Sequence, residues 1–253
     1  MPYKLLTLLL VFTHATFVWA IPDSYTELID YVQVAPDQGN SGTCLFVAST
    51  GAMELIANKK DDIKNPQPYG RYDLSESFLI HAPKFNASGK YSWEVPVLKF
   101  NAGFGIHISQ WDYTAWNGNQ DNAGVWSYRN WTGMKKTALP KIETIPLFVV
   151  GGKWSTNVLN KTHIQKIKEA LWKYKSPVLV NYNDNGFWHV ILIVGYDDHM
   201  PGTCYDQDTP PEECNKDMGS FFVRDSFGVP VEVRDYDWFR IKGNAAVVVK
   251  EAK

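Results

Sequence analysis

A continuous apolar run in the second half of the chain, Val190 to Val194, most constrains the fold of this protein. Its side chains are all Val, Ile or Leu, and His189 stands directly before it. β-Branched residues favour strands, and an apolar run without polar alternation is typical of a strand buried on both faces. Similar runs predict strands at Pro177–Val180, Phe221–Val223 and Ala245–Val249. The second half is therefore predicted to form a buried sheet.

The first half of the chain carries the spacing of helices instead. Between Cys44 and Lys60, apolar side chains recur three or four residues apart, and the preceding Gly-Thr pair indicates a helix start. Further helices are predicted at Leu74–His81, Trp93–Gly103 and Thr162–Tyr174. This segregation predicts an α+β architecture with a mainly helical half over roughly residues 40–135, a mainly β half over 136–253, and a crevice between them.

The first twenty residues have the pattern of a secretory signal peptide. Lys4 is followed by an apolar stretch, and Val18-Trp19-Ala20 matches the small-x-small pattern before a cleavage point. The alternative is a buried N-terminal helix or a membrane anchor, but the run is short for a span and His14 interrupts it. We expect residues 1–20 to be removed, residues 21–253 to form the folded domain, and the protein to be secreted or held in an endomembrane compartment.

Composition excludes several classes of protein. The chain has 253 residues, of which 45% are hydrophobic and 21% charged, so it is neither disordered nor a small disulfide scaffold. A formal net charge of −2 provides no basic surplus for nucleic acid. Beyond the N-terminal segment, no stretch is long and apolar enough to span a membrane. We expect a monomer without a cofactor or metal.

The three cysteines and three glycosylation sequons also bear on a secreted protein. Cys204 and Cys214 flank a short polar loop, and a disulfide between them is the natural pairing. The alternative is a metal site formed by both of these cysteines with His199, although a fourth ligand at the usual spacing is missing. Candidate glycosylation sites are Asn86, Asn130 and Asn160, and chance alone would produce about two such triplets.

The third cysteine belongs to a set of residues suited to nucleophilic catalysis. Cys44 stands at the start of the predicted helix, where backbone N–H groups and the helix dipole favour a thiolate. His189, at the mouth of an apolar strand, is the candidate base, and Asp225, after the next strand, can accept its second N–H. Gln38 can donate its amide to a developing oxyanion, with the backbone N–H of Cys44 as a second donor.

These residues lie in segments that resemble the papain family of cysteine proteases. QGNSGTCLF at residues 38–46 resembles the family's nucleophile motif, and LSE at 74–76 resembles the start of its next helix. WHVILIVGYD at 188–197 resembles its histidine strand, FVRDSFG at 222–228 its Asn-Ser-Trp-Gly segment, and YDWFRI at 236–241 its closing stretch. The ordered set covers most of residues 21–253. It implies the papain-like two-domain fold with Cys44 and His189 facing each other across the cleft.

The sequence departs from the family pattern at several of these positions. Leu45 follows the nucleophile where the family has Trp, and Ser41 replaces a Cys, so the usual first-domain disulfide is lost. Asp225 replaces Asn, and its charge would favour the imidazolium. Phe227 replaces the Trp that shields the hydrogen bond between these two side chains. The chain is therefore expected to be a divergent member.

The resemblance implies a peptidase that hydrolyses peptide or protein substrates through Cys44, His189, Asp225 and Gln38. Substrate contacts are expected at Gly42, Gly89, Trp188 and Phe227. Because only residues 21–37 separate the expected signal cleavage from Gln38, we expect no propeptide domain, and activity could be restrained by a protein inhibitor instead. Two alternatives stay open. One is a weak or inactive papain-like protein that binds peptides or a partner, and the other is an amidase or transglutaminase-like acyl transferase.

Overall fold

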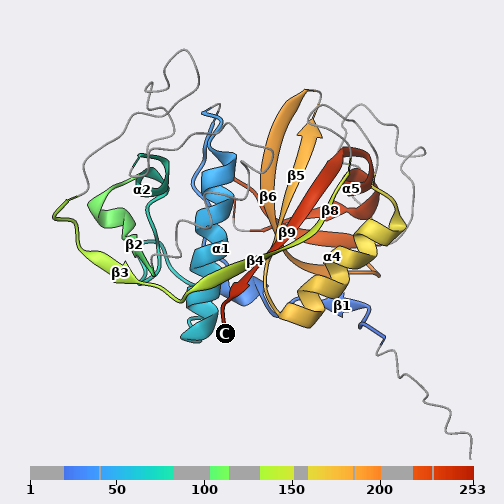
Figure 1. Ribbon diagram of the computed structural model, residues 1–253, viewed down its shortest axis with the longest axis horizontal. Coiled ribbons are helices and arrows are strands. Elements are labelled where there is room, and N and C mark those ends of the chain that lie inside the picture. Colours follow the sequence, from blue (N-terminus) through green and yellow to red (C-terminus); the bar gives the residue numbers. More distant parts are fainter. Residues whose placement is uncertain are drawn as a thin grey trace, which may run out of the picture.

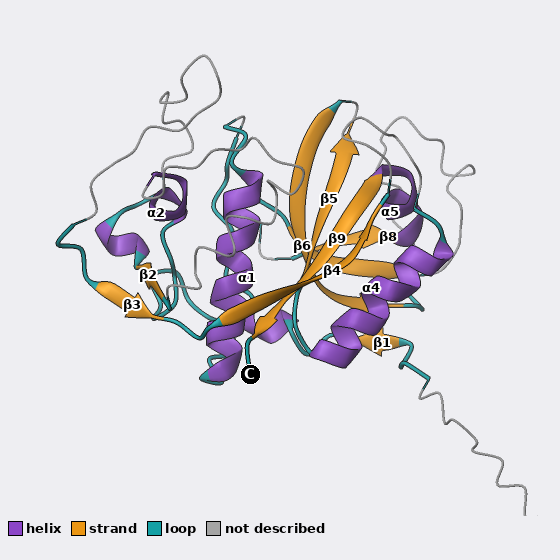
Figure 2. Ribbon diagram, in the orientation of Figure 1, coloured by secondary structure: helices purple, strands orange, loops and turns teal. Residues whose placement is uncertain are grey.

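The computed structural model describes residues 20–39, 41–81, 103–113, 132–150, 159–184, 186–200, 219–229 and 231–253. The N-terminal part of the chain is mainly helical and the C-terminal part forms most of a large antiparallel sheet, as the pattern of the sequence predicts (Figure 1). In the described residues this sheet has seven strands in the order β4-β9-β5-β6-β7-β8, with β1 added against β6. A separate pair, β2 and β3, lies on the other side of α1 (Figure 2). The α+β architecture is therefore confirmed.

The strands include all four that were predicted. Each apolar run extends into a longer strand, because polar residues at the ends join the backbone ladder. The strands are β1 Ser24–Tyr25, β2 Phe104–Ile106, β3 Lys136–Ala138, β4 Ile142–Val149, β5 Val178–Asp184, β6 Phe187–Asp197, β7 Ser220–Arg224, β8 Glu232–Asp235 and β9 Gly243–Glu251.

Three of the predicted helices fall within the described residues. They are α1 Cys44–Lys60, α2 Glu76–His81 and α4 Lys161–Tyr174, and the helix predicted over Trp93–Gly103 lies almost wholly outside the described residues. The structure adds α5 Tyr236–Lys242 and the single 3-10 turns Ile29–Tyr31 and Ile108–Gln110. Among the helices that the structure describes, none is both long and apolar enough to cross a membrane.

Helix α1 is the central packing element. It contacts α2 on one side and β6 on the other, and most of its residues are buried (Figure 2). Gly51 lies where the helix comes closest to the sheet, since a Cβ built there would be 2.1 Å from Nη1 of Arg224. A side chain at this position would therefore displace a buried guanidinium.

Strand register collects one set of polar residues on a single face of the sheet. Tyr182 of β5 pairs with His189 of β6, and Leu192 of β6 pairs with Arg224 of β7. Extending this register by one residue places Asp225 opposite Ile191, two residues from His189 and therefore on the same face. On β8, the partners of Phe221 and Val223 are Arg234 and Glu232, which also share this face. The register thus brings together side chains from four strands: Tyr182, His189, Asp225, Glu232 and Arg234.

Candidate active site

The thiol of Cys44 lies at the first residue of α1 and is 7% exposed. The preceding Thr43 makes no side-chain cap to the helix. The first N–H groups of a helix have no intrahelical partner, and the helix dipole places partial positive charge at this end. The sequence predicts this helix start, and the structure places the thiol where developing negative charge is stabilised.

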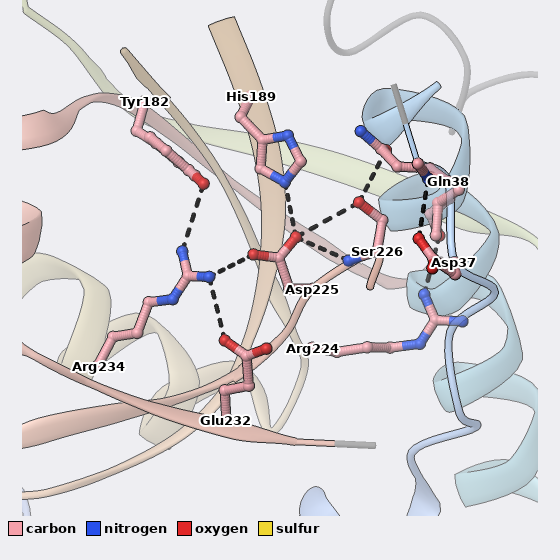
Figure 3. A network of polar contacts seen from close by, with 11 residues as sticks. Asp37, Gln38, Tyr182, His189, Arg224, Asp225, Ser226, Glu232 and Arg234 are labelled. Carbon is pink, nitrogen blue, oxygen red and sulfur yellow. Dashed lines mark hydrogen bonds and ion pairs between the residues drawn. The ribbon is translucent and has the colours of Figure 1, made fainter. Parts of the chain in front are cut away.

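His189 connects the thiol to a buried carboxylate. Its Nε2 lies 2.6 Å from Oδ1 of Asp225 (Figure 3), and the side chain of Cys44 is close enough to raise the pKa of the ring. Since Nε2 is engaged by Asp225, Nδ1 is the ring nitrogen available to the thiol. The structure therefore brings these three residues together at one site.

The environment of His189 favours its protonated form. Burial lowers the pKa of the imidazole, but hydrogen bonds to Asp225 and Cys44, together with their charges, raise it to about 9. Tyr182 contacts the ring edge-on at a centroid distance of 5.2 Å. An imidazolium held between a carboxylate and a thiol is the state that a thiolate–imidazolium pair requires.

Asp225 is ionised in spite of its burial. Burial raises its pKa, but the hydrogen bond and charge of His189, the charge of Arg234 and the N–H of Ser226 together lower it below its usual value. Ser226 N–H donates to Oδ1 at 2.7 Å, and Nη2 of Arg234 donates to Oδ2 at 2.5 Å (Figure 3). Both carboxylate oxygens therefore have strong donors.

Gln38 is held beside these catalytic candidates by the segment that carries Asp225. Its backbone N–H donates to the carbonyl of Ser226 at 2.8 Å, and its side-chain Oε1 accepts from Ser226 Oγ at 2.7 Å. In Figure 3 Gln38 and Ser226 face each other. Because Oε1 is engaged, the amide NH₂ is the part of this side chain that can donate to another group.

Hydroxyl groups hold the loop before the nucleophile. Tyr113 OH lies 2.6 Å from Oγ1 of Thr43 and 3.2 Å from Oγ of Ser41, and these two hydroxyls are 2.8 Å apart. Ser41 also donates to the carbonyl of Gln38 at 2.7 Å. Ser41 occupies the position at which the papain family has a disulfide-bonded cysteine. Here the hydroxyl cluster links the loop to Tyr113 without a covalent bond.

The residues expected to contact substrate have different surroundings. Phe227 is 46% exposed and stacks on His189, with ring centroids 5.6 Å apart and an interplanar angle of 6°. Gly42 has a φ of +64°, and no atom lies within 4 Å of a Cβ built there, so the chain beside the nucleophile is open. Trp188 directly precedes His189 on β6. Because successive side chains of a strand point to opposite faces, Trp188 lies on the face of the sheet opposite to His189. Gly89 lies outside the described residues.

A buried ion pair ties the strand of Asp225 to α1. Arg224 Nη2 lies 3.2 Å from Oε2 of Glu54, and its other nitrogens donate to the carbonyls of Gln33 and Val47 at 2.7 and 2.9 Å. The partners lie in the N-terminal segment and on α1, so one guanidinium connects three parts of the chain. This link fixes Asp225 relative to the helix that carries Cys44.

The other predicted sites are mostly outside the described residues. These are the disulfide Cys204–Cys214 and the sequons at Asn86 and Asn130. Asn160 is exposed and caps α4, where its Oδ1 accepts from the N–H of His163 at 3.1 Å. His199 lies 3.3 Å from Asp23, and no cluster of metal-ligating side chains occurs among the residues the structure describes.

Sequence reasoning missed the supporting residues of the site. Arg234, Tyr182 and Tyr113 reach it from segments far apart in sequence, and nothing local marks them. Ser226 could have been found, because it follows Asp225 in a segment already singled out. Arg224 also carries a local signal, since a charge directly after an apolar strand needs a buried partner.

Comparisons with known proteins agree with this geometry at the level of the fold. No protein-family model matches the sequence, and no curated protein does. The bromelain protease of Ananas comosus, solved with the E64 inhibitor, aligns with a TM-score of 0.57 and 14% identity over 92% of this chain and 100% of its own. The digestive procathepsin L 3 of Tenebrio molitor gives a TM-score of 0.57 and 15% identity over 91% and 70%. The cysteine protease and lectin-like domains of a surface layer associated protein of Clostridium difficile give 0.57 and 16% over 92% and 53%. The chain therefore has the α+β fold of papain-like cysteine proteases.

Proposed function

We propose that this protein is a cysteine peptidase that hydrolyses peptide bonds through Cys44. The observation that carries the proposal is the grouping of Cys44, His189 and Asp225, in which Nε2 of the ring lies 2.6 Å from the carboxylate and Cys44 raises the pKa of the ring. A nucleophile, a base and a group that orients the base are the three parts that this chemistry requires. The papain-like fold supports the same assignment.

In the first half of the reaction, the Cys44 thiolate attacks the substrate carbonyl carbon. The carbonyl electrons move to the oxygen, and the intermediate collapses as the carbon–nitrogen bond breaks. His189 gives its Nδ1 proton to the leaving amine, which departs and leaves a thioester. Asp225 holds the ring through Nε2 during this step.

In the second half, the neutral imidazole takes a proton from water at Nδ1. The resulting hydroxide attacks the thioester carbonyl, the carbon–sulfur bond breaks, and the thiolate–imidazolium pair is restored. One peptide bond and one water are consumed, and one acid and one amine are released.

The oxyanion of each tetrahedral intermediate needs donors that are already in place. The amide of Gln38 is oriented by Ser226, which occupies its oxygen, and the backbone N–H of Cys44 stands at the helix start. Fixed donors of this kind typically contribute a factor of about 10²–10³ in rate. Phe227 covers the outer side of the His189 ring, which shields the bond to Asp225 from water.

The test uses the full chain and its Cys44→Ala variant under mild reduction. Each protein is treated with E64, the inhibitor bound in the bromelain structure, and the intact mass is read. Cleavage of a fluorogenic dipeptide library is followed in parallel. We expect one adduct in the wild type, none in Cys44→Ala, and cleavage only by the wild type. The variant is a matched control, because any adduct that persists in it would lie on another cysteine.

Other outcomes separate the rival functions. An adduct without peptide cleavage, but with incorporation of an added amine, would indicate an acyl transferase. Absence of an adduct from pH about 4 to about 8 would refute the peptidase and favour a protein that only binds peptides.

The expected cellular location remains part of the proposal. We propose that residues 1–20 direct the chain into the secretory pathway and that exposed Asn160 carries a glycan there. Glycosylation modifies Nδ2 and leaves Oδ1 to cap α4. Peptide mapping of secreted protein before and after enzymatic glycan removal tests both statements.

A further inference from the structure

The carboxylate of Asp225 divides its two oxygens between two cations. Oδ1 faces His189 at 2.6 Å, whereas Oδ2 faces Nη2 of Arg234 at 2.5 Å (Figure 3). Nothing in a nucleophile–base–orienting mechanism requires the second cation. A buried arginine costs free energy unless it is paired, so its presence needs a reason.

Arg234 is 1% exposed and is held from several sides. Its Nη2 also lies 3.1 Å from Oε2 of Glu232, and its Nη1 donates to Tyr182 OH at 3.3 Å. The guanidinium carbon lies 4.7 Å from the ring centre of Trp238 on α5. Contact with this ring and several hydrogen bonds hold the guanidinium in place, so its charge is fixed against Oδ2 of Asp225.

The charge balance of the site follows from this arrangement. Without Arg234, the His189 imidazolium would be the one cation among the described residues that lies against the Asp225 carboxylate. The imidazolium would then hold its proton more tightly and would be a weaker acid toward the leaving amine. It would also return less readily to the neutral base that activates water.

We propose that Arg234 is a positioning residue that neutralises Asp225 and so leaves His189 free to exchange its proton during the reaction. This inference rests on the proposed function. The charged and titratable groups around the His189 ring are Cys44 from α1, Tyr182 from β5 and Asp225, with Arg234 and Glu232 from β8 behind the carboxylate.

The test compares Arg234→Met, Asp225→Asn and the double variant with the wild type. Removing the cation strengthens the hold of Asp225 on the proton. We therefore expect the acid limb of kcat in Arg234→Met to move up by about one pH unit, which lowers kcat about tenfold on that side. KM should change by less than about twofold, because substrate does not touch Arg234. The double variant removes both charges together, so it should be more active than Arg234→Met alone.

A merely structural role would not produce this rescue. If Arg234 only packed the sheet, the double variant would be no better than the single one. Arg234→Lys keeps the charge and should keep the acid limb near the wild-type position. Arg240→Met is the matched control, since it removes the same charge from an ion pair with Asp237 on α5. It should leave the limb unmoved.

A second readout separates this inference from the proposed function. The rate of Cys44 alkylation by iodoacetamide, read by mass against pH, follows the thiolate–imidazolium pair without any peptide substrate. We expect its alkaline limb to move up by about one pH unit in Arg234→Met. Should the wild type cleave no peptide, the peptidase is refuted and this profile still decides the role of Arg234. Coincident profiles for wild type and Arg234→Met, or no rescue in the double variant, would overturn the inference. If Arg234→Met fails to show a cooperative melt, Arg234→Lys and the double variant decide it.

Discussion

Two buried carboxyl groups share one guanidinium beneath the active site, and this imbalance predicts how stability depends on pH. Glu54 and Glu76 are 1% and 2% exposed, and Arg224 is the cation that acts on both. Burial raises the pKa of Glu76 to about 7, although the charge of Arg224 opposes that rise. Oε2 of Glu76 makes no hydrogen bond among the described residues, so this oxygen has no donor to stabilise negative charge.

The sign follows from the direction of the shift. The pKa of Glu76 is about 7 in the folded chain and 4.5 in the unfolded chain, so between these pH values the folded chain keeps a proton that the unfolded chain has lost. Stability therefore falls as pH rises from about 4.5 to about 7. The full difference corresponds to about 3 kcal/mol, and most of it is lost between pH 5 and pH 8. Glu76→Gln resembles the protonated side chain and cannot titrate. The variant should therefore keep this free energy at pH 8.

The assay is thermal unfolding of wild type and Glu76→Gln at pH 5 and pH 8. At this chain length, a loss of about 2–3 kcal/mol corresponds to about 5–10 °C. We expect the gap in Tm between variant and wild type to widen in favour of Glu76→Gln by that amount at pH 8. Glu169→Gln, which changes an exposed carboxylate on α4 that accepts from Gln165, is the matched control. Parallel pH curves for Glu76→Gln and wild type would refute the reasoning.

Three further predictions test the packing and the electrostatics of the site. Gly51→Ala should destabilise the protein by about 3 kcal/mol or more in urea unfolding, because its Cβ would lie 2.1 Å from the buried Arg224 guanidinium. Alanine ordinarily favours a helix over glycine by about 1 kcal/mol, so a stabilised variant would contradict this geometry. Tyr113→Phe removes the hydroxyl that holds the nucleophile loop. It should cost about 1 kcal/mol and slow alkylation of Cys44, whereas an unchanged rate would show that the cluster does not position the thiol. In Cys44→Ala, His189 loses a hydrogen bond and a charge that raise its pKa to about 9, so its imidazole NMR signals should titrate at lower pH than in the wild type. An unshifted titration would show that Asp225 alone sets that value.

Local periodicity was sufficient for the elements with strong patterns. The apolar spacing after Cys44 predicted a helix ending at Lys60, and α1 has these bounds. The run after His189 predicted β6, whose flanking residues extend it at both ends. In both elements, burial of one continuous apolar set depends on spacing along the chain, which the sequence displays directly.

Elements with weak patterns could not be found in this way. Strand β4 contains Pro146, which argues against a central strand. It is tolerated because, within the described part of the chain, β4 is an edge strand that pairs with β9 alone, and the register shifts directly after this proline. Helix α5 spans only Tyr236–Lys242, too short for a periodic signal, and begins where Asp235 accepts from the N–H of Trp238.

The sequence by itself determined the α+β fold class and the order of its segments, and it singled out Cys44, His189, Asp225 and Gln38 as the candidate site. Only the tertiary structure decided that Arg234 lies against the carboxylate, that Tyr182 contacts Arg234 and the His189 ring, and that Tyr113 holds the nucleophile loop. The physical reason lies in the range of each signal. Helix and strand periodicity are written within a few residues, whereas the partner of a buried charge is chosen by strand register across the sheet, which no local pattern encodes.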